Sequence, residues 1–92
     1  MGSGVIRCRG VVRGRVQGVW YRQGCKEAAQ AAGVSGWVRN RPDGTVEAVL
    51  EGDEPAVAEM LAWMGLGPPL AVVDGLDHEA EEVRGERGFT VR

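Results

Sequence analysis

The sequence is poor in the residues that most often carry chemistry by themselves, because it contains one histidine and two cysteines among 92 residues. His78 lies far along the chain from Ser3 and Ser35, so no serine is paired with a base in the way that nucleophilic catalysis requires. One histidine and two separated cysteines, Cys8 and Cys25, also lack the spacing of metal ligands. The sequence therefore predicts neither a serine nucleophile nor a metal site, and we expect no cofactor.

Other absences narrow the class of protein further. No apolar stretch approaches the ~20 residues of a membrane span, and two cysteines without a secretory signal are typical of a reduced, cytoplasmic protein. A Walker A ending of Gly-Lys-Ser/Thr is missing, as is the aromatic stretch of an RNA-recognition strand. The length allows one domain, which we place at residues 5–92 after an expected disordered leader at residues 1–4.

Charge is distributed unevenly along the chain, although the formal net charge is only −2. Residues 1–41 contain eight basic residues and one acid, a net charge of +7, whereas residues 42–92 contain twelve acids and three arginines, a net charge of −9. Either the basic half binds an anionic ligand, or basic and acidic strands lie side by side in one sheet and neutralise each other. Both interpretations can hold, because an anion site needs only one or two arginines.

The hydrophobic pattern switches between a period of two and a helical period, with turn residues between the segments. The predicted elements are a strand at 5–13, a helix at 22–32, strands at 34–40 and 45–51, a helix at 54–64, and strands at 70–79 and 89–92. This β-α-β-β-α-β order, with a possible extra edge strand, predicts an α+β, ferredoxin-like two-layer sandwich in which two helices cover one face of an antiparallel sheet.

The segment between the first strand and the first helix has the features of an oxyanion site. Gly14 and Gly18 bracket a short loop, and Arg22 stands where the helix begins. Amide N–H groups of the loop and the first helical turn, together with the positive end of the helix macrodipole, favour an anion there. A cation in a first turn lies against that dipole, so a bound anion explains Arg22 better than a surface role does. Phosphate is the anion we expect.

Asn40 is the candidate for orienting a water molecule near this loop. It ends a predicted strand just before the turn Arg41-Pro42-Asp43-Gly44, and its carboxamide can both donate and accept a hydrogen bond. Asparagine is also common as the residue that initiates a turn. Spacing alone favours neither role.

Two segments carry a resemblance to a known family. Residues 12–22 (VRGRVQGVWYR) and 36–47 (GWVRNRPDGTVE) resemble the first and second signatures of the acylphosphatases. Residues 67–73 (GPPLAVV) and 89–92 (FTVR) are similar to the closing segments of that family, so the resemblance covers the chain from Val5 onward. Tyr21 departs from the usual phenylalanine of the family but keeps the aromatic ring.

The resemblance implies hydrolysis of the carboxyl-phosphate bond of an acyl phosphate, with no metal and no covalent enzyme intermediate. By the same resemblance, Arg22 binds the phosphate and Asn40 positions the attacking water, whose proton passes to the substrate phosphate. Inorganic phosphate is then both product and inhibitor. The implied phosphate-binding loop consists of Arg15, Val16, Gln17, Gly18, Val19, Trp20 and Tyr21.

Two other functions stay open at this point. A non-catalytic module for nucleic acid or a phosphorylated partner would use the basic first segment and Trp37, although the net acidity and the two signatures argue against it. The domain could also be a free-standing relative of the acylphosphatase-like modules found at the start of larger maturation enzymes. We expect a monomer that binds a small acyl phosphate and neither nucleic acid nor a membrane.

Overall fold

The computed structural model describes residues 4–92. Its elements follow the chain in the order β1 (Val5–Arg15), α1 (Tyr21–Ala32), β2 (Ser35–Asn40), β3 (Val46–Asp53), α2 (Glu54–Leu66), β4 (Val72–Glu81) and β5 (Phe89–Val91). The leader expected at residues 1–4 lies, apart from Gly4, outside the described residues. Within residues 4–92, no helix combines the length and apolar character that crossing a membrane requires.

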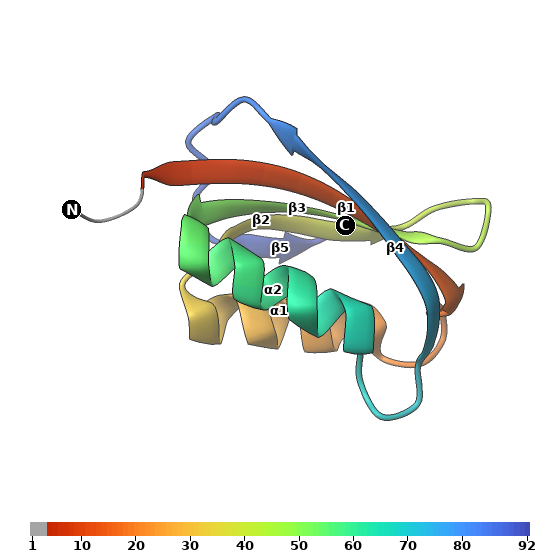
Figure 1. Cartoon of the computed structure of the whole chain (residues 1–92). Helices are drawn as coiled ribbons and strands as arrows, with labels where there is room; N and C mark the ends of the chain where they lie inside the picture. Colours follow the sequence, from red (N-terminus) through yellow and green to blue (C-terminus); the bar gives the residue numbers. More distant parts are fainter. Residues whose placement is uncertain (1–3) are drawn as a thin grey trace.

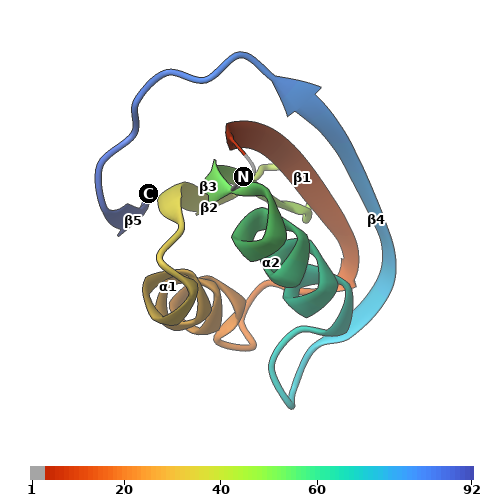
Figure 2. The ribbon, with the colours of Figure 1, turned by 60° about the vertical axis from the view of Figure 1, so that its left-hand side comes forward.

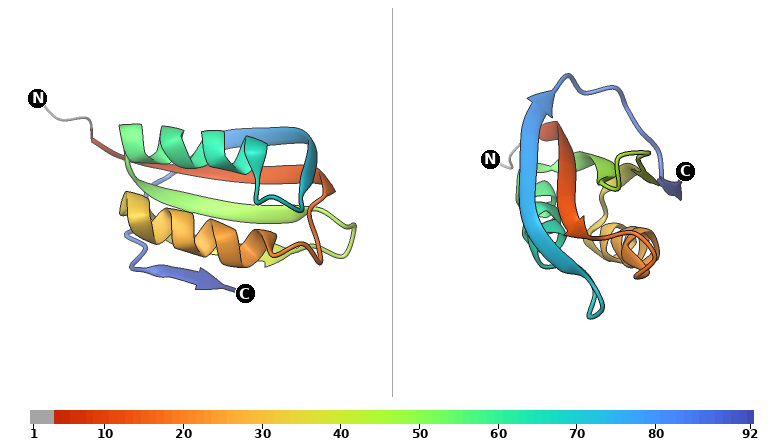
Figure 3. Two further views of the ribbon diagram at one scale, coloured as in Figure 1. Left: turned by 90° about the horizontal axis from the view of Figure 1, so that it is seen from below. Right: turned by 90° about the vertical axis from the view of Figure 1, so that its right-hand side faces the viewer.

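The strands form one sheet in the order β4-β1-β3-β2-β5, and both helices pack on the same face of it (Figures 1 and 2). The predicted ferredoxin-like sandwich is therefore confirmed, including the additional edge strand. Neighbouring strands are antiparallel except β2 and β5, which run parallel, so the sheet is mixed. The parallel pair arises because the 82–88 segment crosses from β4 at one edge to β5 at the other (Figure 3).

Glycines with positive φ end both helices where the sequence predicts. Gly33 (φ 74°) follows α1, and the N–H groups of Gly33 and Val34 bond to carbonyls of the last turn. Gly67, also at φ 74°, follows α2. The expected strand at 70–79 instead runs from Val72 to Glu81. It is shifted because residues 68–71 form a turn closed by Ala71 N to Pro68 O, and because pairing with β1 continues to Glu81.

The two faces of β3 have different chemistry. Val46, Ala48 and Leu50 belong to the hydrophobic core under the helices, as the alternation predicts. Glu47 and Glu51 lie on the opposite, helix-free face, yet both are buried. Their carboxylates are covered by arginine side chains, because β1 and β2 flank β3 on either side.

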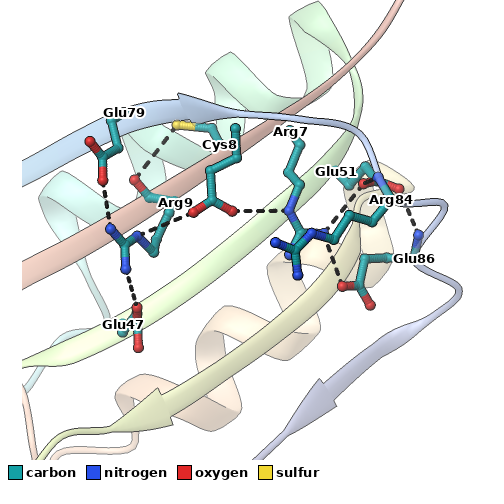
Figure 4. A network of polar contacts seen from close by, with 9 residues as sticks. Arg7, Cys8, Arg9, Glu47, Glu51, Glu79, Arg84 and Glu86 are labelled. Atoms are coloured by element: carbon teal, nitrogen blue, oxygen red, sulfur yellow. Dashed lines mark hydrogen bonds and ion pairs between the residues drawn. The ribbon is translucent and has the colours of Figure 1, made fainter.

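Ion pairs, most of them between neighbouring strands, neutralise five of the eight basic residues in the first half of the sequence. On the helix-free face, Arg7 contacts Glu51, Glu81 and Glu86 at 3.4, 3.0 and 2.9 Å (Figure 4). Arg9 pairs with Glu47, Glu79 and Glu81, Arg13 with Asp77, Arg39 with Glu47, and Arg41 with Asp43. The expectation that basic and acidic strands neutralise each other is thus confirmed.

Glu51 also fastens the 82–88 segment to the sheet. Its carboxylate accepts the main-chain N–H groups of Arg84 and Glu86 at 2.8 and 2.6 Å, besides the guanidinium of Arg7 (Figure 4). Burial alone raises the pKa of Glu51, but these three donors outweigh it and hold the pKa below its usual value. The segment leads directly into β5, so Glu51 helps to place the residues of that strand.

Replacing Glu51 by glutamine is expected to lower the free energy of unfolding by about 3 kcal/mol at pH 7, because buried donors lose their charged acceptor. A carboxyl whose pKa is lowered by folding stabilises the protein above its unfolded pKa, and this contribution is lost as the pH falls through the folded value. The difference between wild type and Glu51→Gln in urea denaturation should therefore shrink as the pH is lowered below the ordinary value of 4.5.

Glu79→Gln is the matched control for this measurement. Like Glu51, Glu79 forms an ion pair with an arginine, in this case Arg9. Its side chain is 64% exposed, however, compared with 4% for Glu51. An exposed ion pair contributes less than about 1 kcal/mol. Equal losses in the two variants, or a Glu51→Gln loss that does not change with pH, would contradict this role for Glu51.

Candidate active site

Strand direction brings three chain segments to one end of the sheet. Because β1 and β2 are both antiparallel to β3, they run the same way, and β5 runs parallel to β2. The carboxyl ends of β1, β2 and β5 therefore lie at the same end. The loop that follows β1, the last residue of β2 (Asn40) and the last residue of β5 (Val91) meet there.

The loop between β1 and α1 bends through two left-handed residues. Gly18 has φ 73°, and Trp20 has φ 67°, the one positive φ at a non-glycine residue within residues 4–92. A left-handed tryptophan costs backbone strain of about 1 kcal/mol or more, and strain of this kind is concentrated at functional sites. Trp20 is 76% exposed, so burial of the indole does not offset the backbone strain.

The start of α1 presents free hydrogen-bond donors. The first helical hydrogen bond runs from Gly24 N to Trp20 O at 3.0 Å, which leaves the N–H groups of residues 21–23 without an intrahelical acceptor. No side chain caps this end, and the first turn contains no acidic residue. Within the described residues 4–92, no acidic side chain of the first turn and no side-chain cap therefore compensates the positive end of the helix macrodipole.

Arg22 adds a guanidinium to these donors. It is half-buried in the first turn of α1 and forms no ion pair with any of the residues 4–92. Its Nη1 donates to the main-chain oxygen of Arg92 at 3.3 Å. Arg92 is held in turn by its N–H bond to Val38 O at 2.8 Å and by its guanidinium, which lies 4.3 Å from the ring centre of Trp37.

Asn40 faces the same region from β2. Asn40 pairs with Val46 of β3, which on its other side pairs with Val12 of β1. Asn40 therefore lies level with the last residues of β1 before the loop. Among the side-chain atoms of residues 4–92, Asn40 Oδ1 is the buried oxygen or nitrogen without a hydrogen-bond partner. A buried polar atom without a partner costs about 1–3 kcal/mol, which a structural residue would not retain.

These groups share one cavity of about 400 Å³. Arg22, Asn40, Val16, Gly18, Trp20 and Tyr21 line it, together with Gln23 and Val91. Of the other residues that the sequence suggests for the loop, Arg15 is exposed at the end of β1, Val19 is buried in the core, and Gln17 directs its amide to the hairpin between β2 and β3.

The structure therefore adds two residues to the cavity that sequence reasoning did not name. Gln23 follows Arg22 in the first helical turn and could have been found from that position. Val91 could not, because its place depends on the parallel pairing of β5 with β2.

Tyr21 in the cavity lining and Cys25 one helical turn later stay protonated near neutral pH. Tyr21 is 1% exposed, and its hydroxyl donates to Met64 O at 2.8 Å, which links α1 to α2. Burial raises the pKa of Tyr21 far above its usual range and that of Cys25 to about 12. Neither group can act as a base or thiolate nucleophile near neutral pH, so the reactive character of the cavity lies in its donors and in Asn40.

The fold and the cavity together define a ferredoxin-like protein whose N–H donors and guanidinium favour an anionic ligand. The acylphosphatase family model matches residues 8–91. An acylphosphatase of Thiobacillus denitrificans is 52% identical over 82 residues, covering 88% of this chain and 90% of that protein. One of Rubrobacter xylanophilus is 54% identical over 87 residues, covering 94% and 79%. The crystal structure of acylphosphatase from Bacillus subtilis has a TM-score of 0.92 at 32% identity, covering 95% and 98%.

The chain belongs to the acylphosphatase family and is a hydrolase of that class. The resemblance seen in the two sequence motifs is thereby confirmed.

Proposed function

We propose that this protein hydrolyses acyl phosphates to a carboxylate and inorganic phosphate without a metal ion, using Arg22, the loop amides and Asn40. The observation that carries the proposal is one cavity in which an uncapped helix start meets Arg22 and Asn40 Oδ1. Within residues 4–92, Arg22 has no acidic side-chain partner and Asn40 Oδ1 has no hydrogen-bond partner. In a member of the acylphosphatase family, the N–H groups and the arginine are suited to bind the phosphate, and the asparagine is suited to hold the water.

The phosphoryl group of the substrate would lie over the first turn of α1. The N–H groups of the loop and of residues 21–23 donate to its equatorial oxygens, and Arg22 can supply two further parallel donors. Transfer of a phosphoryl group from a good leaving group depends mainly on positioning and on stabilising these oxygens. A carboxylate is such a leaving group, so no strong general acid is needed.

Asn40 would orient the attacking water. Its Oδ1 accepts a hydrogen bond from the water, which leaves a lone pair of the water oxygen directed at phosphorus. The new phosphorus–oxygen bond forms as the bond to the acyl oxygen breaks, the carboxylate leaves with the electron pair, and the water proton passes to a phosphate oxygen. Such substrate-assisted transfer fits a cavity whose tyrosine and neighbouring cysteine stay protonated.

The acyl group would extend from the cavity past its rim. Trp20 lies on that rim with an exposed indole, and Val16 and Val91 supply apolar lining. We therefore place the acyl group against Trp20. The protein would act as a cytoplasmic monomer folded as one domain at residues 5–92, with inorganic phosphate as product and competitive inhibitor.

The binding of nucleic acid is the less favoured alternative. The arginines of β1 and β2 that make the first half of the sequence basic are mostly engaged with Glu47, Glu51 and the acids of β4. They do not form a free basic stripe of the kind that follows a phosphate backbone.

Hydrolysis of benzoyl phosphate in the presence of EDTA tests the proposal directly. We expect turnover that is insensitive to EDTA, only modestly reduced by salt, and competitively inhibited by millimolar phosphate. Absence of turnover by the folded protein would contradict the proposed reaction. Tight binding of an oligonucleotide that weakens steeply with salt would favour the alternative.

A further inference from the structure

The side chain of Gln17 joins the phosphate-binding loop to the hairpin that follows Asn40. Its Nε2 donates to Arg41 O at 2.8 Å and to Thr45 O at 2.9 Å. Both partners are carbonyl oxygens, so only the NH2 group of the amide can satisfy them. Gln17 itself lies between Val16 and Gly18, which line the cavity, so the contact connects the loop backbone to the hairpin across a sequence separation of 24 and 28 residues.

The hairpin turn is held by its own hydrogen bonds, independently of this contact. Arg41 N donates to Thr45 O at 2.8 Å, and Gly44 N donates to Arg41 O at 3.1 Å. Asp43 Oδ1 accepts from the N–H and the hydroxyl of Thr45 at 3.0 and 2.6 Å. The two carbonyls that Gln17 holds therefore belong to a rigid turn, and each accepts one hydrogen bond from the turn and one from Gln17.

Asn40 is attached directly to this turn. The N–H of Arg41, which belongs to the peptide group between Asn40 and Arg41, donates to the same Thr45 oxygen that Gln17 holds. We infer that Gln17 is a positioning residue that sets the separation between the phosphate-binding loop and Asn40. This role rests on the proposed function, in which the loop holds the phosphate and Asn40 holds the water.

The inference separates two steps of the reaction. The phosphate contacts come from Arg22 and main-chain N–H groups, and Gln17 uses its side chain elsewhere. The two hydrogen bonds from Gln17 to Arg41 O and Thr45 O are called the clamp below. Loss of the clamp should therefore leave phosphate binding intact and displace the water relative to phosphorus. A displacement of this kind, well below the size of a residue, lowers turnover by one to about two decades in well-oriented reactions.

Gln17→Met tests the inference, because methionine matches glutamine in length, is uncharged and has no N–H donor. We expect kcat for benzoyl phosphate to fall about tenfold, with the inhibition constant of inorganic phosphate unchanged within about twofold. Gln30→Met, at an exposed position of α1, is the matched control and should keep wild-type values. Urea denaturation of each variant establishes that folded proteins are being compared. If the methionine variant is unstable, Gln17→Asn replaces it in the experiment, because asparagine is too short to reach both carbonyls.

A double-mutant cycle tests whether Gln17 acts through Asn40. In an Asn40→Ala background, Gln17→Met should cost less than about twofold in kcat, because the group that it positions is already missing. An equal loss in both backgrounds, wild-type kcat in a folded Gln17→Met, or a matching loss of phosphate affinity would each overturn the inference.

A second readout does not depend on activity. Asn40 is the single asparagine of the chain, so its side-chain NH2 resonances can be assigned by selective labelling. Gln17→Met should shift these resonances, whereas Gln30→Met should not. Unshifted Asn40 resonances in Gln17→Met would overturn the clamp even if the wild type is active. An inactive wild type with shifted resonances would instead contradict the proposed reaction and leave the clamp supported.

Discussion

Arg22→Ala is expected to lower kcat/KM for benzoyl phosphate by about two decades or more, the range found when a donor to the transition state is removed. Arg22 supplies guanidinium donors at the uncapped start of α1 and forms no ion pair within the described residues, so its removal should leave the fold intact. Inhibition by inorganic phosphate should weaken as well, because the same side chain contacts product and transition state. Steady-state kinetics with phosphate as inhibitor, alongside urea denaturation, measures all three quantities.

Lys26→Ala provides the control for that experiment. Lys26 lies one helical turn after Arg22 in α1, carries the same charge and does not line the cavity. If charge on this helix merely attracts the anionic substrate, both variants should lose a similar, salt-dependent factor. A folded Arg22→Ala with near wild-type turnover, or a comparable loss in Lys26→Ala, would contradict the assignment of Arg22.

Asn40→Ala should also reduce turnover by about two decades, but through kcat alone. Asn40 is proposed to hold the water and not the phosphate, so the inhibition constant of phosphate should stay near its wild-type value. The two variants thus differ in a measurable way: phosphate affinity falls in Arg22→Ala and persists in Asn40→Ala. A loss of phosphate affinity in Asn40→Ala would show that the residue belongs to the phosphate site.

The stability of Asn40→Ala gives an independent check of the same residue. Because Asn40 Oδ1 is buried without a partner among residues 4–92, its removal breaks no hydrogen bond of that atom. We expect a urea midpoint equal to or above that of the wild type, the pattern of a residue retained for activity at some cost in stability. Ser35→Ala, at the other end of β2, is the control. A clear loss of stability in Asn40→Ala would favour a turn-initiating role.

The element order was predictable because it depends on local periodicity and on turn residues. Gly33 ends α1 and Gly67 ends α2 by adopting positive φ angles that need no distant partner. Strand bounds were less accurate. β1 continues to Arg15 and β4 to Glu81 because each strand extends as far as its neighbour pairs with it, through a bulge at Arg13 and Gly14. Pairing of this kind is not encoded in either strand alone.

The phosphate-binding part of the site could be inferred for the same local reason. The free N–H groups, the helix dipole and Arg22 all lie within a few residues of one another, so their arrangement follows once α1 begins after the loop. The side-chain roles inside the loop could not be inferred. The expected role of Gln17 concerns its main-chain N–H in the phosphate-binding loop, and the sequence offered no sign that its side-chain amide contacts a hairpin more than 20 residues away.

The order of strands and helices, the family, and an anion-favouring loop next to Arg22 could be predicted from the amino-acid pattern, because these depend on contacts between chain neighbours and on motif spacing. The shared cavity of Asn40 and that loop, the link that Gln17 makes between them, and the pairing of Arg7, Arg9, Arg13 and Arg39 with buried or cross-strand carboxylates became visible in the three-dimensional arrangement. Those features depend on which strands lie side by side and in which register. Register is fixed by packing the whole sheet against its helices, which no single segment specifies.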